Sequence, residues 1–355
     1  MRSKTPERSP LSIFRLGHRF VFKLNPIGKA CALSCFFALA SHSAFAQNKV
    51  AVNALPTGGQ VVAGSATISS SQTATSATMN INQTSQRAVI NWNTFNVGKN
   101  ATVNFNQPNS SAVTLNRVTS ATPSMIEGAI KANGQVILVN PNGVNFGKGA
   151  EVHAAGVVAS TLDINNKDFM EGKNTYSGNG QGKIVNEGKI VATDPNGYIA
   201  LLAPEVRNEG YLLARKGSGS TIAIASGEKI TLDFRGTQLV RVSVDVATYK
   251  GLIENKRVIE TNGGLVVLAA GTARDLMSSL IQNTGRISAN AIVDNGGVID
   301  IVATNVNQAG TVSANGKGAN STGGQINIVG ENITLAANSK TTATGQAGGG
   351  AIQIG

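Results

Sequence analysis

A short unit that recurs along the second half of the chain constrains the fold more than any other feature. The unit reads Asn-x-Gly-x-apolar-x-Ala and begins at Asn186, Asn208 and Asn283, with looser copies from Asn255 and Gln308. A second unit, Gly-x-apolar-x-apolar, alternates with it and begins at Gly197, Gly264, Gly297, Gly324 and Gly350. Successive copies lie mostly 22 to 33 residues apart, which is typical of repeat architectures.

Period-2 alternation inside and before these units predicts short β-strands with one buried face. Residues 102–106 read Thr-Val-Asn-Phe-Asn, so their apolar side chains share one side of a strand. Two strands per repeat and no long helical pattern leave a β-helix, a propeller or stacked hairpins as candidates. Propeller repeats are longer and carry aromatic marks, which this chain lacks. The sequence therefore predicts an all-β fold, a right-handed parallel β-helix (β-solenoid) of about 14 coils.

Equivalent positions in the repeats make this prediction specific. Ile190, Leu212, Ile287 and Val312 fill the apolar position of the first unit, so we expect all four to point into one core. The asparagines that open the unit are expected to stack as a hydrogen-bonded ladder, with glycines at the corners. The sequence stops within a repeat, and solenoids need capped ends, so we expect the repeats to continue beyond residue 355.

The first 46 residues differ from the rest and predict an extended secretory signal peptide. They hold seven of the 30 basic residues and one of the 19 acidic residues, followed by an apolar run at 30–40. Ala44 and Ala46 supply the small residues that a signal peptidase requires, so cleavage is expected before Gln47. The apolar run is shorter than the about 20 residues that cross a bilayer. We therefore expect the Sec export machinery to deliver the chain to the periplasm.

Composition excludes several kinds of site from the exported part. More than half of the net charge of +11 lies in the signal segment, which argues against a nucleic-acid partner. Cys31 and Cys35 both precede residue 47, so no disulfide, thiolate nucleophile or cysteine metal site remains. His153 is the only later histidine, and the acidic residues are scattered. We therefore predict no enzyme, and no catalytic residue, metal site or cofactor.

Two asparagine-rich stretches interrupt the less repetitive part between residues 50 and 165. The first is INWNTFNVG at 90–98, and the second is QVILVNPNGVNFG at 135–147. The second reads as a strand, a turn and a strand. Asn140-Pro141-Asn142-Gly143 suits a β-turn, because proline presets one dihedral angle and Asn and Gly tolerate unusual ones. An isolated NPNG of this kind would indicate a hairpin turn and nothing more.

These stretches in this order resemble the two-partner-secretion domain of filamentous haemagglutinins and high-molecular-weight adhesins. The resemblance extends from about residue 48 to about residue 270. It rests on the first stretch together with the segments at 103–118, 134–147 and 226–234. The resemblance implies a β-helix with a short amino-terminal cap. It also implies a partner, an outer-membrane β-barrel transporter with periplasmic binding domains. The residues assigned to partner recognition are Asn91, Trp92, Asn93, Phe95, Asn96, Asn140, Pro141, Asn142 and Gly143.

The resemblance divides the chain into three parts: the signal peptide at 1–46, a secretion domain at 47–270, and further repeats at 271–355. The second family motif, Asn-Pro-Asn-Leu, is absent, and the nearest sequence is Gln107-Pro108-Asn109-Ser110, which favours the high-molecular-weight-adhesin branch. The expected function is to direct secretion of a large adhesin-type protein to the medium or the cell surface. The alternative is a secreted β-helix protein that binds or cleaves glycans, with a host-cell glycan or receptor as its partner.

Overall fold

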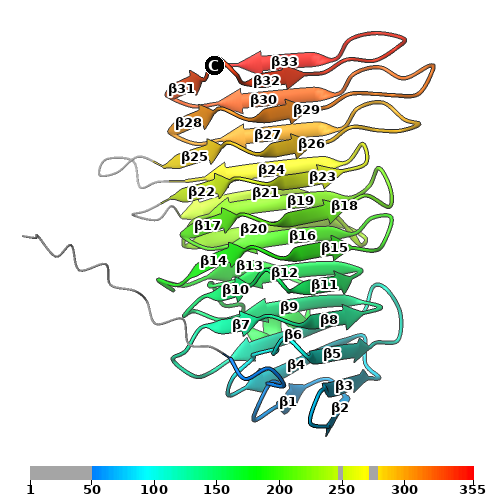
Figure 1. The fold of residues 1–355 in the computed structure, drawn as a ribbon, viewed down its shortest axis with the longest axis vertical. Coiled ribbons are helices and arrows are strands. Elements are labelled where there is room, and N and C mark those ends of the chain that lie inside the picture. Colours follow the sequence, from blue (N-terminus) through cyan, green and yellow to red (C-terminus); the bar gives the residue numbers. More distant parts are fainter. Residues whose placement is uncertain (1–49, 247–250, 272–278) are drawn as a thin grey trace, which may run out of the picture. The chain divides into compact units, whose positions relative to one another are not determined.

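A computed structural model describes residues 50–246, 251–271 and 279–355, and these residues form a parallel β-helix (Figure 1). The predicted signal peptide lies outside the described residues. Sheet 1 contains β1 (Gln60–Ala63), β4 (Arg87–Trp92), β6 (Val113–Val118), β9 (Gln135–Val139), β12 (Gly156–Ser160), β16 (Tyr198–Leu202), β19 (Thr221–Ser226), β24 (Leu265–Ala270), β27 (Val298–Val302), β30 (Gln325–Val329) and β33 (Ala351–Ile354).

Two further long sheets complete the coil. Sheet 2 contains β7 (Ser124–Ile126), β10 (Val144–Phe146), β14 (Lys183–Asn186), β17 (Glu205–Asn208), β22 (Leu252–Asn255), β25 (Leu280–Asn283), β28 (Asn305–Gln308) and β31 (Asn332–Leu335). Sheet 3 contains β2 (Ala66–Gln72), β3 (Ala77–Gln83), β5 (Ala101–Asn106), β8 (Ala129–Ala132), β11 (Glu151–Ala154), β15 (Lys189–Ala192), β18 (Tyr211–Ala214), β23 (Val258–Thr261), β26 (Arg286–Ser288), β29 (Thr311–Ser313) and β32 (Lys340–Thr342).

Each complete coil contributes one strand to each sheet, so the prediction of two strands per repeat was wrong. The first sequence unit spans a corner: Asn186 ends β14, Gly188 turns the chain, and Ile190 lies in β15. The second unit is the strand of sheet 1. The prediction of about 14 coils was also too high, because sheet 2 has 8 strands in the described residues. A coil of three strands uses more residues than the predicted coil of two strands. In addition, two long segments leave the coil and form the side layer described below.

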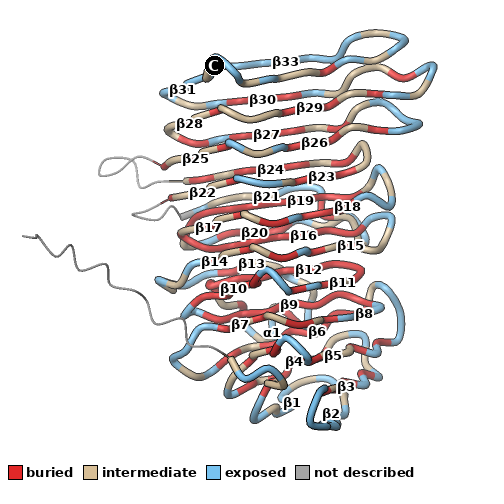
Figure 2. The backbone as a smooth tube through the Cα atoms, viewed as in Figure 1, coloured by how far each residue is buried: buried red, intermediate tan, exposed pale blue. Residues whose placement is uncertain are grey.

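The four residues expected in the core are buried, which confirms the alignment of the repeats. Ile190, Leu212, Ile287 and Val312 are each 0% exposed. Parallel pairing places Ile190 beside Leu212 and Ile287 beside Val312, with Ile259 between the two pairs. Buried residues recur along the coils between the two ends in Figure 2 and stack into one continuous apolar column, whereas the strands of the last coil, β31, β32 and β33, are exposed or half-buried. Burial of this column is the main term that holds the coils together.

The predicted asparagine ladder is present at the corner between sheets 2 and 3. The Asn186 Nδ2 donates to Asn208 Oδ1 at 2.8 Å, and the Asn208 Nδ2 donates to Asn255 Oδ1 at 2.8 Å. Asn255 donates to Asn283 at 2.8 Å, and Asn283 donates to Gln308 at 2.7 Å. All five side chains are buried. Each amide therefore donates to the next one where water is excluded, and at the first member the Asn186 Oδ1 accepts no hydrogen bond from the described residues.

A cap closes the amino-terminal end of the helix, as expected from the resemblance. β1 pairs antiparallel with β4, and β2 pairs antiparallel with β3, whereas the later coils pair in parallel. These two strands cover edges that would otherwise expose unpaired backbone groups. Near the cap, Gly59 lies against the ring of Trp92, where a Cβ atom would sit 2.5 Å from Trp92 Cζ3.

A side layer covers the outer face of sheet 1, which the sequence did not predict. It consists of α1 (Asn166–Met170) and an antiparallel sheet of β13 (Thr175–Ser177), β20 (Lys229–Arg235) and β21 (Gln238–Val246). Asn165 caps α1 by accepting from the backbone amides of Lys167 and Asp168. Phe169, Tyr176 and Leu232 pack with outward side chains of sheet 1 in a second apolar cluster. Within the described part of the chain, no helix has the length and apolarity needed to span a membrane.

Candidate recognition corner

The NPNG sequence forms the corner between β9 and β10, which belong to different sheets. It is therefore a turn between sheets 1 and 2 rather than the turn of a hairpin. The Gly143 amide donates to the Asn140 carbonyl oxygen at 2.9 Å, which closes a four-residue turn. Gly143 has φ +112°, a region that L side chains rarely adopt, and a Cβ atom there would lie 2.8 Å from the Lys183 carbonyl oxygen. Glycine is thus required by the turn itself.

Asn140 is fully buried and uses its amide to hold two neighbouring segments. Its Nδ2 donates to the carbonyl oxygen of Thr122 and to Ser124 Oγ, both at 3.0 Å. Its Oδ1 accepts from the backbone amide of Asn142 at 3.0 Å. Its own backbone amide donates to the Ser160 carbonyl oxygen at 2.9 Å. The buried amide is therefore satisfied on both sides, and it joins three successive coils.

Pro141 and Asn142 are exposed on the outer side of the same turn. The Asn142 Nδ2 donates to the Ser120 carbonyl oxygen at 3.0 Å. The Asn142 Oδ1 accepts no hydrogen bond from the described residues. The turn therefore has a buried structural half, Asn140 and Gly143, and an exposed half, Pro141 and Asn142.

The first asparagine-rich stretch, at 90–98, is likewise divided into buried residues and exposed residues. Trp92 and Phe95 are each 1% exposed, and their rings meet edge to face with centroids 5.6 Å apart. The Trp92 indole donates to Asn116 Oδ1 at 3.0 Å. Asn96 Oδ1 accepts from the Met125 backbone amide at 2.8 Å, and Asn93 is exposed. The two aromatic residues belong to the core, so they cannot contact a partner in this folded state.

The loop at 119–122 joins the two stretches into one surface. It follows β6, and its Thr119 and Ser120 amides donate to the carbonyl oxygens of Trp92 and Asn93. Asn140 and Asn142 hold its other side. The corner segments 93–96, 119–122 and 140–143 therefore stack on successive coils. We call these three segments the recognition corner.

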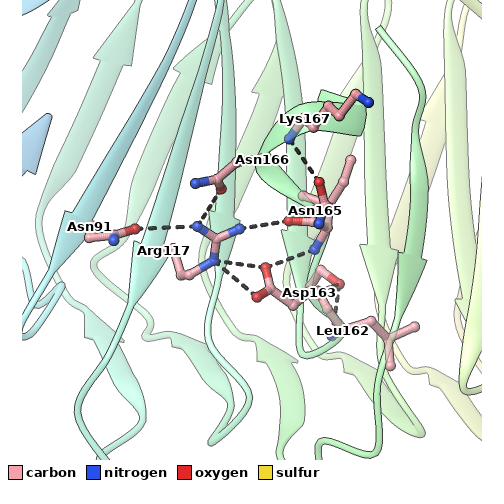
Figure 3. A network of polar contacts seen from close by, with 9 residues as sticks. Asn91, Arg117, Leu162, Asp163, Asn165, Asn166 and Lys167 are labelled. Carbon is pink, nitrogen blue, oxygen red and sulfur yellow. Dashed lines mark hydrogen bonds and ion pairs between the residues drawn. The ribbon is translucent and has the colours of Figure 1, made fainter. Parts of the chain in front are cut away.

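Asn91 does not lie in that corner and instead belongs to a polar network under the side layer (Figure 3). Arg117 is the centre of this network. Its guanidinium pairs with Asp163 at 2.9 Å and donates to Asn166 Oδ1 at 2.7 Å and to the Ile164 carbonyl oxygen at 2.6 Å. It also donates to Asn91 Oδ1 at 3.3 Å. The network fixes the start of the excursion that carries α1, because one rigid guanidinium donates to Asp163, Ile164 and Asn166.

Sequence reasoning missed the loop at 119–122 and the role of Arg117. The loop had a local signal, since its Thr-Ser-Ala-Thr sequence ends at Pro123 and is typical of a loop. Arg117 had none, because its partner Asp163 lies 46 residues away. In the described parts of the chain, no group of three or more His, Asp and Glu side chains could hold a metal ion.

Three parallel sheets around one core, with an antiparallel cap and a side layer, define the class as a capped parallel β-helix. The family follows from sequence comparison, because the sequence model that describes the TPS secretion domain family matches residues 53–299 of this chain. The chain therefore belongs to the TPS (two-partner secretion) secretion domain family, which confirms the resemblance found in the sequence.

Two known proteins illustrate the similarity. A Heme/hemopexin-binding protein of Haemophilus influenzae is 30% identical over an alignment of 231 residues, and the match covers 61% of this chain and 24% of that protein. This chain thus spans about a quarter of that relative's length. The solved HMW1 secretion domain of Haemophilus influenzae superposes with a TM-score of 0.67 at 28% identity, covering 82% of this chain and 74% of that domain.

Proposed function

We propose that this chain directs its own export through an outer-membrane β-barrel transporter with periplasmic binding domains. The match of the TPS secretion domain to residues 53–299 is the observation that carries the proposal. In this proposal the segment 1–46 leads the chain through the Sec machinery into the periplasm, and the product is secreted or stays at the cell surface. No catalytic step is assigned to these coils, since their acidic residues are scattered and His153 is the single histidine after residue 46.

Within this function, the recognition corner has two roles. Asn140 and Gly143 shape the corner from inside, since one is buried with satisfied hydrogen bonds and the other has a positive φ. Asn93, Pro141 and Asn142 are exposed and offer the partner donors and acceptors at fixed positions. Trp92, Phe95 and Asn96 hold the first stretch in place, and Asn91 acts further off, through Arg117.

Paired substitutions separate the two roles. Asn140→Ala leaves the Thr122 carbonyl oxygen and Ser124 without their donor, so we expect a loss of about 1–3 kcal/mol in unfolding free energy and a loss of export. Asn142→Ala removes an exposed hydrogen bond to the Ser120 carbonyl oxygen, so we expect a loss of less than about 1 kcal/mol in unfolding free energy but reduced export. Asn338→Ala is the matched control, because Asn338 is also exposed but lies in the last coil.

Export is measured as the secreted fraction in cells that carry the transporter, and stability is measured by thermal unfolding of the purified protein. Normal export of both corner variants would contradict the role of the corner. Normal export of wild-type protein from cells that lack the transporter would contradict the proposed function itself.

A further inference from the structure

A cleft of about 480 Å3 lies between the side layer and the early coils of sheet 1. It is separate from the recognition corner. Sheet 1 contributes Arg87, Val113, Gln135, Ile137 and Tyr198 to its walls. The side layer contributes Gly172, Asn174, Phe234, Gly236 and Thr237, and the turn residues Gln86 and Ser111 complete the rim. The cleft is large enough for a small organic ligand and has polar groups on several sides.

Arg87 is the only charged residue in the walls of this cleft. Its Nη1 donates to the Phe169 carbonyl oxygen at 3.0 Å, and its guanidinium carbon lies 5.1 Å from the centre of the Phe169 ring. A guanidinium has five N–H donors, and no other hydrogen bond from Arg87 to the described residues is present. Most of its donors are therefore free for a ligand.

The charge of Arg87 is not balanced by an acidic partner in the described structure. The acids of the adjacent helical segment, Asp168 and Glu171, pair with Lys173 at 3.4 and 2.8 Å instead. Burial lowers the pKa of Arg87, and the opposing influence comes from the hydroxyls of Tyr198 and Tyr176. Since burial of an unpaired charge is costly, an anion at this position would be stabilising.

We propose that the cleft binds a small hydroxylated monocarboxylate, of the size of a sugar acid, with its carboxylate on Arg87. A single cation matches a single negative charge better than a phosphate dianion, and a guanidinium fits a carboxylate in two parallel hydrogen bonds. The Thr237 hydroxyl and the Asn174 side-chain oxygen suit a ligand with hydroxyl groups, whereas Gln86 and Ser111 at the rim bond to one another and to Asn109. The ring of Tyr198 gives this ligand one apolar wall, and its hydroxyl is held by Gln135 at 2.8 Å.

A purely structural role for Arg87 is the competing explanation. In that case the guanidinium would only fasten α1 to β4 through Phe169. The two explanations differ in the effect of a variant that closes the cleft and leaves Arg87 in place. Thr237→Trp is such a variant, because Thr237 lies at the rim, in the turn between β20 and β21, and makes no hydrogen bond to Arg87.

The test is a ligand-observed NMR titration of the purified full chain with D-glucuronate, with D-glucose and an acidic peptide as comparisons. We expect saturable binding of D-glucuronate, and a loss of affinity of about tenfold or more in Thr237→Trp and in Arg87→Gln. Thermal unfolding should show that Thr237→Trp stays folded, so the test stands even if Arg87→Gln does not fold.

Several results of the titration would overturn this proposal. They are no saturable binding of D-glucuronate, equal binding by wild type and Thr237→Trp, and equal binding of D-glucose and D-glucuronate. Binding of the acidic peptide but not of D-glucuronate would also overturn it. The transporter is absent from this titration, so its result leaves the export proposal untouched.

Discussion

At the scale of single residues, position along the coil decides what a side chain can do. Ile287 is 0% exposed in the core, whereas Ile292 is 69% exposed in the loop five residues later. Both are isoleucines of the same coil, so they form a natural pair for measuring the cost of charge in this core.

We expect Ile287→Asp to lower the unfolding free energy by at least about 4 kcal/mol, because the carboxylate would be buried without a partner. Ile292→Asp should change it by no more than about 0.5 kcal/mol. Urea unfolding followed by circular dichroism measures both. Similar losses in the two variants would contradict the inward direction of Ile287.

We expect the stability at alkaline pH to depend on two buried tyrosines, Tyr176 and Tyr198. Burial raises the pKa of the Tyr176 and Tyr198 hydroxyls above the usual value of about 10. The neutral form is therefore favoured by folding, and this contribution is complete below a pH of about 10 and is lost as the pH rises beyond it. We expect the unfolding free energy to fall in that range.

Tyr176→Phe should weaken this alkaline loss. The Tyr176 hydroxyl has no hydrogen-bond partner among the described residues, so its removal should change stability at pH 7 by less than about 1 kcal/mol. Unfolding curves at pH 8 and above pH 10 compare the variant with wild type. An unchanged fall in stability at high pH would show that Tyr176 is not one of the groups responsible.

At the scale of elements, strands and corners follow different rules. The strands β3 and β5 were predictable, because alternation over six or more residues identifies the inward side chains. The strands of sheet 2 were not, since each has only three or four residues, which is too short to show a clear period. The NPNG turn was predicted from its own residues. Its contacts with 119–122 were not, because they depend on how coils stack.

The asparagine ladder is the element whose removal gives the sharpest test. Asn255→Leu removes the acceptor of Asn208 and the donor to Asn283, so we expect a loss of about 2–4 kcal/mol. Asn338→Leu, in an exposed position, is the control. Urea unfolding measures the loss, and amide hydrogen exchange should locate it in the coils of β17, β22 and β25. Equal behaviour of the two variants would exclude a stabilising role for the ladder.

At the scale of the whole molecule, the repeated coils were predicted and the side layer was not. The segments that build this layer, 161–182 and 229–246, do not repeat, so no comparison within the chain exposes them. Their apolar residues, such as Phe169 and Tyr176, pack onto strands far away in the sequence. The expected boundary at residue 270 stays a prediction, and the family model extends to residue 299.

Processing of the whole chain gives a further prediction. Signal peptidase requires small side chains before its cut, and Ala44 and Ala46 provide them, so the exported protein should begin at Gln47. Amino-terminal sequencing of the secreted material checks this. Replacing Ala46 by a bulky residue should block cleavage and retain the chain in the cell. Secreted protein that keeps the basic segment would contradict the prediction.

The ladder also sets a unit for changes in the length of this protein. Asn255 and Asn283 are 28 residues apart, and Asn283 and Gln308 are 25 residues apart, yet each pair meets in the same geometry. Removing residues 283–307 would place Gln308 at the ladder position of Asn283, so that Asn255 could donate to it. Gly310 would again follow two residues later. A deletion of half that length would bury unmatched side chains. We therefore expect the ladder to survive the removal or addition of a whole coil, whereas extra length within a coil is taken up by loops, as in the 47 residues between Asn208 and Asn255.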